Sequence, residues 1–121
     1  VKIKTGSQQL IKETNIRHVF KLVSLSDGIS RAELANRTKL SPTTISSLVD
    51  ELISAGFILE AGPGDIPTSG RKPIMLRINP KGGCIVAADL REDGYFLEVF
   101  NLSGVSVVDK FITRAQSLSN K

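Results

Sequence analysis

The sequence predicts an α+β fold in which three helices come first and antiparallel strands follow. Two observations support this prediction. Up to residue 56, apolar residues recur at every third or fourth position, as they do on the buried face of a helix. From residue 57 onward, apolar residues alternate with polar ones or form short runs bounded by Gly and Pro, as in strands joined by turns.

The N-terminal residues give the weakest signal. Residues 1–7 are mostly polar, and we expect them to be loose. Residues 8–14 are expected to form a short separate helix, with Leu10 and Ile11 as its apolar anchor.

The first strong helical pattern follows this segment. Its apolar stripe has the spacing i, i+3, i+4, i+7 and consists of Ile16, Val19, Phe20 and Val23. We expect Thr14 or Asn15 to cap the start of this helix, and Asp27-Gly28 to end it.

The second helix is expected to be short. Ser30 is a good N-cap, and Glu33, three residues later, completes the pattern of a capping box. Leu34 and Ala35 supply a small apolar face, and the helix is expected to stop near Asn36.

The third helix has the strongest start signal in the chain. Ser41 is expected to cap it, and Pro42 takes the first helical position, where a missing N–H costs nothing. Its apolar stripe consists of Ile45, Leu48, Val49 and Leu52. Ala55-Gly56 is expected to close it, because Gly adopts the left-handed conformation that follows many helices.

The next residues predict a hairpin with a long loop. Residues 57–60 are expected to form one strand and residues 73–79 the returning strand, in which Ile74, Leu76 and Ile78 alternate with Met75 and Arg77. Residues 61–72 contain three Gly and two Pro and are expected to form a loop. Three helices and such a hairpin make a winged helix-turn-helix, which we expect to occupy residues 1–80.

Residues 81–121 predict a three-stranded β meander. The expected strands are residues 84–90, 95–102 and 105–112, joined by short turns at residues 91–94 and 103–104. A meander of this kind exposes an apolar face and a sheet edge when it stands alone. We therefore expect these residues to begin a second domain whose remainder is missing.

The charge distribution favours a polyanionic partner for the first part of the chain. The net charge is +4; residues 1–80 contain 11 Lys and Arg against 7 Asp and Glu, whereas residues 81–121 contain five of each. The positive excess therefore lies in the predicted winged helix-turn-helix, which is the pattern of a nucleic-acid-binding domain.

Composition excludes several other classes. No apolar run approaches the roughly 18 residues of a membrane span, and no secretory signal is visible. One Cys and one His exclude an intrachain disulfide and a Cys/His zinc site within the chain. We expect a cytoplasmic protein without metal or cofactor.

The second and third helices form the pair that reads DNA in helix-turn-helix proteins. With the apolar stripe buried, the N-terminal part of the third helix is left to contact the major groove. The candidate residues there are Ser41, Pro42, Thr43, Thr44, Ser46 and Ser47. Asp50 and Glu51 lie farther along the helix, away from the phosphates. The alternative is an ordinary solvated helix in a bundle.

The loop of the hairpin supplies the second group of candidates. Gly70, Arg71 and Lys72 precede Pro73, which places two cations in an extended segment that fits an A·T-rich minor groove. The alternative is a solvated charged loop.

A few residues outside the helix and the loop also bear on function. Ser30 and Arg31, with Arg37, are candidates for contacts to the phosphate backbone, although capping and solvation explain them equally well. His18 is interpreted as a surface or packing residue, and Cys84 as a small hydrophobe. Asp89 follows an apolar run and is interpreted as a structural turn acid rather than a metal or sugar ligand. No catalytic group is predicted.

Four segments resemble the ROK family, whose name stands for repressors, open reading frames and kinases. They are residues 30–35 (SRAELA), 40–46 (LSPTTIS), 51–56 (ELISAG) and the wing motif GRKP at residues 70–73. The resemblance runs from about residue 5 to about residue 112. It implies that a sugar-binding domain with an actin-like ATPase fold follows the wing.

The chain also departs from this family at two places. Asp89 stands where the kinase members have a phosphate-loop acid followed by Gly-Gly-Thr, but here Leu90-Arg91-Glu92 follow, so kinase activity is not expected. The family's zinc cluster and sugar-contacting acids have no counterpart in these residues. Lys39 stands where the family often has Gly, which implies a strained backbone if the position needs a positive φ.

These observations predict a DNA-binding transcriptional regulator, a repressor of carbohydrate genes. Its expected partner is double-stranded operator DNA rich in A·T pairs, bound by a homodimer or higher oligomer, with no membrane contact. A sugar effector would act only through the missing C-terminal region. The alternatives are the N-terminal part of a ROK-type sugar kinase, or a winged helix that binds another protein.

Overall fold

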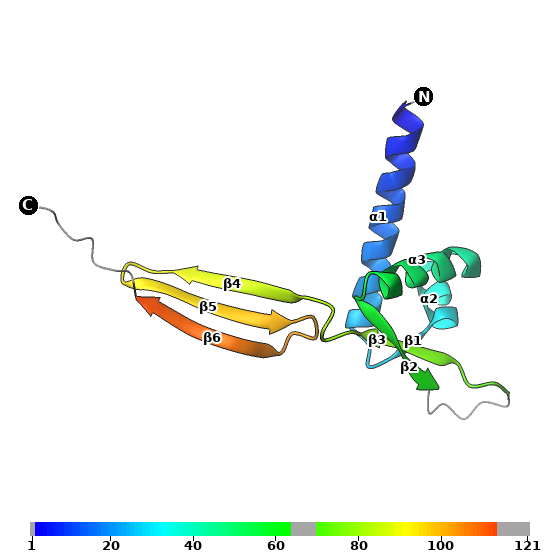
Figure 1. The fold of residues 1–121 in the computed structure, drawn as a ribbon. Helices are drawn as coiled ribbons and strands as arrows, with labels where there is room; N and C mark the ends of the chain where they lie inside the picture. The colour runs from blue at the N-terminus through cyan, green and yellow to red at the C-terminus, as the bar shows by residue number, and fades with distance from the viewer. Residues whose placement is uncertain (1, 64–69, 114–121) are drawn as a thin grey trace, which may run out of the picture.

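A computed structural model describes residues 2–63 and 70–113 (Figure 1). Its elements, in chain order, are α1 (Lys2–Ser24), β1 (Ile29–Ser30), α2 (Arg31–Thr38), α3 (Pro42–Ser54), β2 (Ile58–Pro63), β3 (Ile74–Ile78), β4 (Cys84–Leu90), β5 (Gly94–Asn101) and β6 (Ser106–Thr113). Helices α1 to α3 pack with the sheet β1-β3-β2, and β4-β5-β6 form a separate sheet. The α+β winged helix-turn-helix followed by a β meander is therefore confirmed.

Helix α1 is one continuous helix, so the prediction of a loose start and two separate helices was wrong. Thr14 does not cap a new helix, because its hydroxyl donates to the carbonyl of Leu10 at 2.9 Å within the same helix. Residues 8–24 contain neither Pro nor Gly, so nothing in the chain interrupts the helical hydrogen bonds. Leu10 and Ile11 are 64% and 59% exposed and anchor nothing, since this half of α1 projects beyond the rest of the chain (Figure 1).

Helix α2 begins as the sequence predicts but ends later. The Ser30 hydroxyl accepts a hydrogen bond from the backbone N–H of Glu33 at 3.1 Å, whereas the Glu33 carboxylate pairs with Arg37 one turn farther on. The helix runs to Thr38 rather than stopping near Asn36. It ends at Lys39, whose φ of 61° makes it the one non-glycine residue with positive φ in the described ranges. The resemblance to the ROK family, which often has Gly at this position, implied such a backbone.

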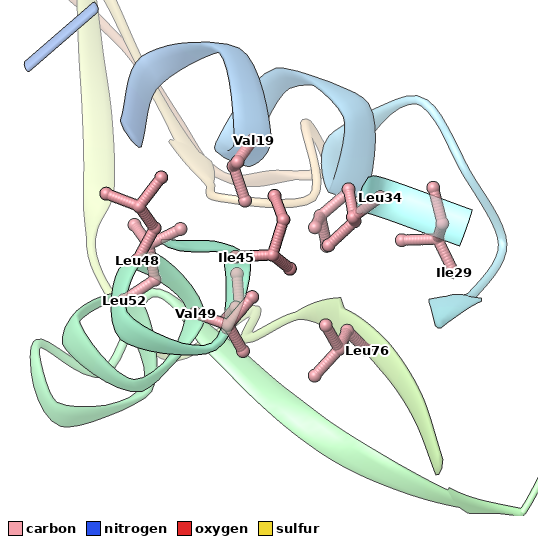
Figure 2. Packing of buried hydrophobic residues seen from close by; sticks show 10 residues of the cluster. Val19, Ile29, Leu34, Ile45, Leu48, Val49, Leu52 and Leu76 are labelled. Carbon is pink, nitrogen blue, oxygen red and sulfur yellow. The ribbon is translucent and has the colours of Figure 1, made fainter. Parts of the chain in front are cut away.

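Helix α3 follows the sequence prediction closely. Ser41 is the N-cap, Pro42 lies in the first turn, and the Ser41 hydroxyl accepts from the backbone N–H of Thr44 at 3.1 Å. All four stripe residues of this helix are buried. They join a core that consists of Val19, Val23, Ile29, Leu34, Ile45, Leu48, Val49, Leu52, Ile58 and Leu76 (Figure 2). Three helices and both long wing strands thus share one apolar cluster.

The wing sheet contains a strand that the sequence analysis missed. Strand β1 is two residues long and pairs with β3 through Ile29 opposite Leu76, both fully buried. Two residues are too few to show a period. Strand β2 continues to Pro63, so the prediction that the loop begins at residue 61 was wrong; the pairing with β3 shifts register between Glu60 and Pro63. Residues 64–69 lie outside the described residues.

The β meander is confirmed, together with its exposed apolar surface. Strands β4, β5 and β6 pair in order and antiparallel. Every residue of β4 is exposed, and Ile85 and Leu90 are 57% and 81% exposed. Cys84, at the start of this strand, is exposed as well and does not pack as a buried hydrophobe.

The segment between the wing and the meander is held against the winged helix. Asn79 donates from its side-chain amide to the carbonyl of Gly56 at 2.7 Å, and from its backbone N–H to the carbonyl of Phe57 at 2.9 Å. Leu102, in the turn after β5, lines an apolar pocket of about 330 Å³ with Ile16, Arg17, Phe20, Leu52 and Phe57. Gly82 passes so close that a Cβ there would lie 2.2 Å from the oxygen of Gly56.

This close approach gives a prediction for Gly82→Ala. The added methyl group forces backbone to move, so the free energy of unfolding is expected to fall by about 1–3 kcal/mol. Urea denaturation followed by circular dichroism measures it. Gly83→Ala is the matched control, since its Cβ would meet Leu102 side-chain atoms at 3.6–3.8 Å, an ordinary contact. Equal denaturation midpoints for the two variants would contradict the close packing at Gly82.

Candidate nucleic-acid interface

The N-terminal half of α3 presents short polar side chains to solvent. Ser41, Pro42, Thr43 and Ser47 are exposed, and Thr43 and Ser47 lie one turn apart on the same face. Thr44 is half-buried, and its hydroxyl lies 2.8 Å from that of Ser41. The side chains free to meet a ligand at this end are therefore chiefly those of Thr43 and Ser47.

Ser46 has a different position from its neighbours. It is half-buried, and its carbonyl oxygen accepts a hydrogen bond of 3.4 Å from Arg31. The structure therefore places Ser46 on the side of α3 that faces α2.

The electrostatics of α3 favour an anion at its N-terminus. The first turn contains no acidic residue, and the helix dipole adds positive potential there. The two acids farther along are paired within the chain: Asp50 with Arg31 at 3.0 Å, and Glu51 with Lys12 of α1 at 2.6 Å. These ion pairs reduce the repulsion that the carboxylates would exert on a polyanion.

The base of the wing lies beside the start of α2. Arg71 and Lys72 are exposed, and Gly70 before them has a φ of 140°, which favours glycine. A concave surface of about 300 Å³ is lined by Ser30, Arg31, Ala32, Arg71, Lys72, Pro73 and Ile74. The fold thus brings together two groups of candidates that lie 40 residues apart in the sequence. Within the described ranges, neither Arg71 nor Lys72 forms an ion pair.

Arg31 is not a free cation. One of its terminal nitrogens lies 3.0 Å from Asp50 of α3, and the other lies 3.1 Å from Glu60 of β2. Its side chain is 32% exposed. Sequence reasoning missed Asp50 and Glu60 as its partners, because neither lies within a helical turn of Arg31 and no local pattern connects the three.

The remaining polar candidates form no second site. His18 is exposed, and Arg37 pairs with Glu33. Asp89 accepts hydrogen bonds from Arg91 at 2.7 and 2.9 Å, and this contact raises the pKa of the Arg91 guanidinium. Among the residues that the structure describes, no three His, Cys, Asp or Glu side chains come together to hold a metal, and no helix is long and apolar enough to cross a membrane.

Comparison with known proteins agrees with the winged helix-turn-helix fold. The family described as "Winged helix-turn-helix DNA-binding" matches residues 13–58. A putative xylose repressor of Caldicellulosiruptor sp. (strain Rt8B.4) is 35% identical over 99 residues, which cover 82% of this chain and 25% of that protein. The xylose repressor of Bacillus subtilis (strain 168) is 33% identical over 106 residues, which cover 88% of this chain and 27% of that protein.

A solved structure gives the same result. The crystal structure of a ROK family transcriptional regulator, described as a homolog of the E. coli MLC protein, matches with a TM-score of 0.69 and 28% identity. The match covers 85% of this chain and 26% of that one. The chain thus spans about a quarter of the length of the relatives that it matches. From its sequence, its fold and these matches, the chain contains a winged helix-turn-helix domain and is similar to ROK family transcriptional regulators over the segment that it shares with them.

Proposed function

We propose that this chain is the DNA-binding part of a transcriptional regulator that represses carbohydrate-metabolism genes. One observation carries the proposal: the fold places Arg71 and Lys72, which form no ion pair with any described residue, beside the start of α2, while the N-terminal face of α3 is left polar and exposed. The names of the relatives support the regulatory role, since they include repressors of xylose and N-acetylglucosamine genes in several bacteria.

The proposed contacts divide between the two grooves of DNA. The N-terminal part of α3 enters the major groove, where Thr43 and Ser47 meet base edges, while Ser41, Pro42, Thr44 and Ser46 hold or flank that surface. Gly70, Arg71 and Lys72 follow the adjacent minor groove, where A·T-rich sequence has the most negative potential. Ser30 lines the concave surface together with Arg71 and Lys72, and it contacts the phosphate backbone.

The remaining parts of the proposal concern the whole protein. Residues 1–80 form the DNA-reading unit, and residues 81–121 are the first part of a second domain. The rest of that domain covers the exposed face of β4 to β6. The matched relatives are about four times as long as the segment that they share with this chain, so a sugar effector acts through sequence outside that segment. Palindromic operators favour a homodimer or a higher homo-oligomer. The proposed location of the protein is the cytoplasm. No enzymatic role is proposed, because Leu90-Arg91-Glu92 follow Asp89, where the kinase members have Gly-Gly-Thr.

The first prediction concerns the double variant R71Q/K72Q. It is expected to bind DNA at least about tenfold more weakly, because its contacts to phosphate are lost. Each lost contact also flattens the dependence of log K on log salt by about 0.9. The probe is a duplex that the wild-type chain enriches from a random-sequence pool, and fluorescence anisotropy at several salt concentrations measures the binding. The control K81Q/K110Q removes the same charge from exposed positions outside the wing. Wild-type affinity and slope in R71Q/K72Q would refute the minor-groove assignment.

The second prediction concerns Thr43→Val, which replaces a hydroxyl with a methyl group of similar size. Affinity for the enriched duplex is expected to fall about fivefold, because a hydrogen bond contributes about 1 kcal/mol. The salt slope is expected to remain unchanged, since no charge is removed. Thr14→Val, an identical substitution on the exposed part of α1, is the control and is expected to bind as the wild type does. A loss of equal size in both variants contradicts a base contact by Thr43.

A further inference from the structure

The side chain of Arg31 joins three elements of the winged helix at one point. Arg31 is the first residue of α2, and its guanidinium reaches Asp50 and the carbonyl of Ser46 in α3. On its other side it reaches Glu60 in β2 at 3.1 Å. A planar guanidinium with donors in a fixed fork holds two acceptors in a defined orientation, which a single ammonium does not.

The second end of this contact is connected to the wing. Glu60 lies in β2 opposite Leu76 of β3, and its neighbour Leu59 lies opposite Arg77. Strand β3 begins at Ile74, immediately after the segment that contains Arg71 and Lys72. Arg31 therefore contacts the element that presents Thr43 and Ser47, and also the sheet that leads to the cations of the wing.

The local charge argues against a direct phosphate contact by Arg31. Two carboxylates surround one guanidinium, so the cluster of Arg31, Asp50 and Glu60 carries a formal charge of −1. A phosphate that approached Arg31 would meet both carboxylates and would have to displace one of them. Exposed ion pairs of this kind contribute little to folding, so the main effect of the cluster is on orientation.

We propose that Arg31 is a positioning residue that sets the spacing between α3 and the wing. By holding Asp50 and Glu60, it determines how far apart the major-groove and minor-groove elements of a bound sequence must lie. This inference rests on the proposed function and deepens it, because it assigns a specificity-determining role to a residue that does not touch DNA. α3 and the wing read the bases, and Arg31 sets the distance along the DNA between the two base sequences that α3 and the wing contact.

The test uses Asp50→Asn, Glu60→Gln and Arg31→Gln in the 121-residue chain. Each chain selects binding sites from a duplex pool with a random core, and the selected sequences are read out. The wild type is expected to select one spacing between its most specific block and the A·T-rich block. The three variants are expected to select at least two spacings and to bind the wild-type site at least about threefold more weakly. Their salt slopes are expected to stay within about half a unit of the wild-type slope.

A direct contact between Arg31 and phosphate would give a different set of results. If Arg31 contacts phosphate, Asp50→Asn and Glu60→Gln release it and remove negative charge, so both variants bind more tightly at a single spacing. Arg31→Gln then flattens the salt slope by about 0.9. Either outcome overturns the positioning role, as does retention of a single spacing in all three variants.

The control variant is Glu51→Gln, which removes one carboxylate from α3 without touching Arg31, because Glu51 pairs with Lys12. It is expected to keep the single spacing. Thermal unfolding followed by circular dichroism establishes that each variant is folded at the temperature of selection. If the folded wild-type chain shows no salt-dependent binding to any duplex, the proposed function itself fails. If the wild type binds and the variants keep its spacing, only the role of Arg31 fails.

Discussion

Burial of the apolar stripe of α3 is the constraint on which the rest of the structure depends. Ile45 and Val49 are fully buried among residues of α1, α2 and the wing sheet, and Leu48 and Leu52 are nearly so. Because a helix turns by about 100° per residue, this burial leaves Thr43 and Ser47 on the opposite, exposed face. The same packing that stabilises the fold therefore selects the side chains that are offered to a ligand.

Several acids of the winged helix are paired with cations within the chain, whereas the described residues supply no ion pair for the cations of the wing. Asp50, Glu51 and Glu60 each have a cationic partner from another element, and Glu33 has one within its own helix. Arg71 and Lys72 have none among the described residues. The ion pairs thus offset the acids of α3 and β2, whereas Arg71 and Lys72 keep their charge available to a polyanion.

The errors of the sequence analysis have identifiable physical causes. The polar residues on either side of Thr14 give no periodic signal, yet the helix continues through them because residues 8–24 contain no Pro or Gly. Strand β1 exists only because Ile29 pairs with Leu76, 47 residues away, and β2 is longer than predicted for a similar reason, its pairing with β3. Pairing of this kind leaves no mark on the local sequence.

The sequence by itself determined the local features: the caps Ser30 and Ser41, the stripe of α3, and the turns of the meander. Each of these depends on residues within a few positions of one another, so spacing and residue type suffice. Only the tertiary structure decided that Arg31 is enclosed by Asp50 and Glu60, and that the wing cations lie beside the start of α2. Those contacts join residues 19 to 42 positions apart, and the packing of the core brings them together.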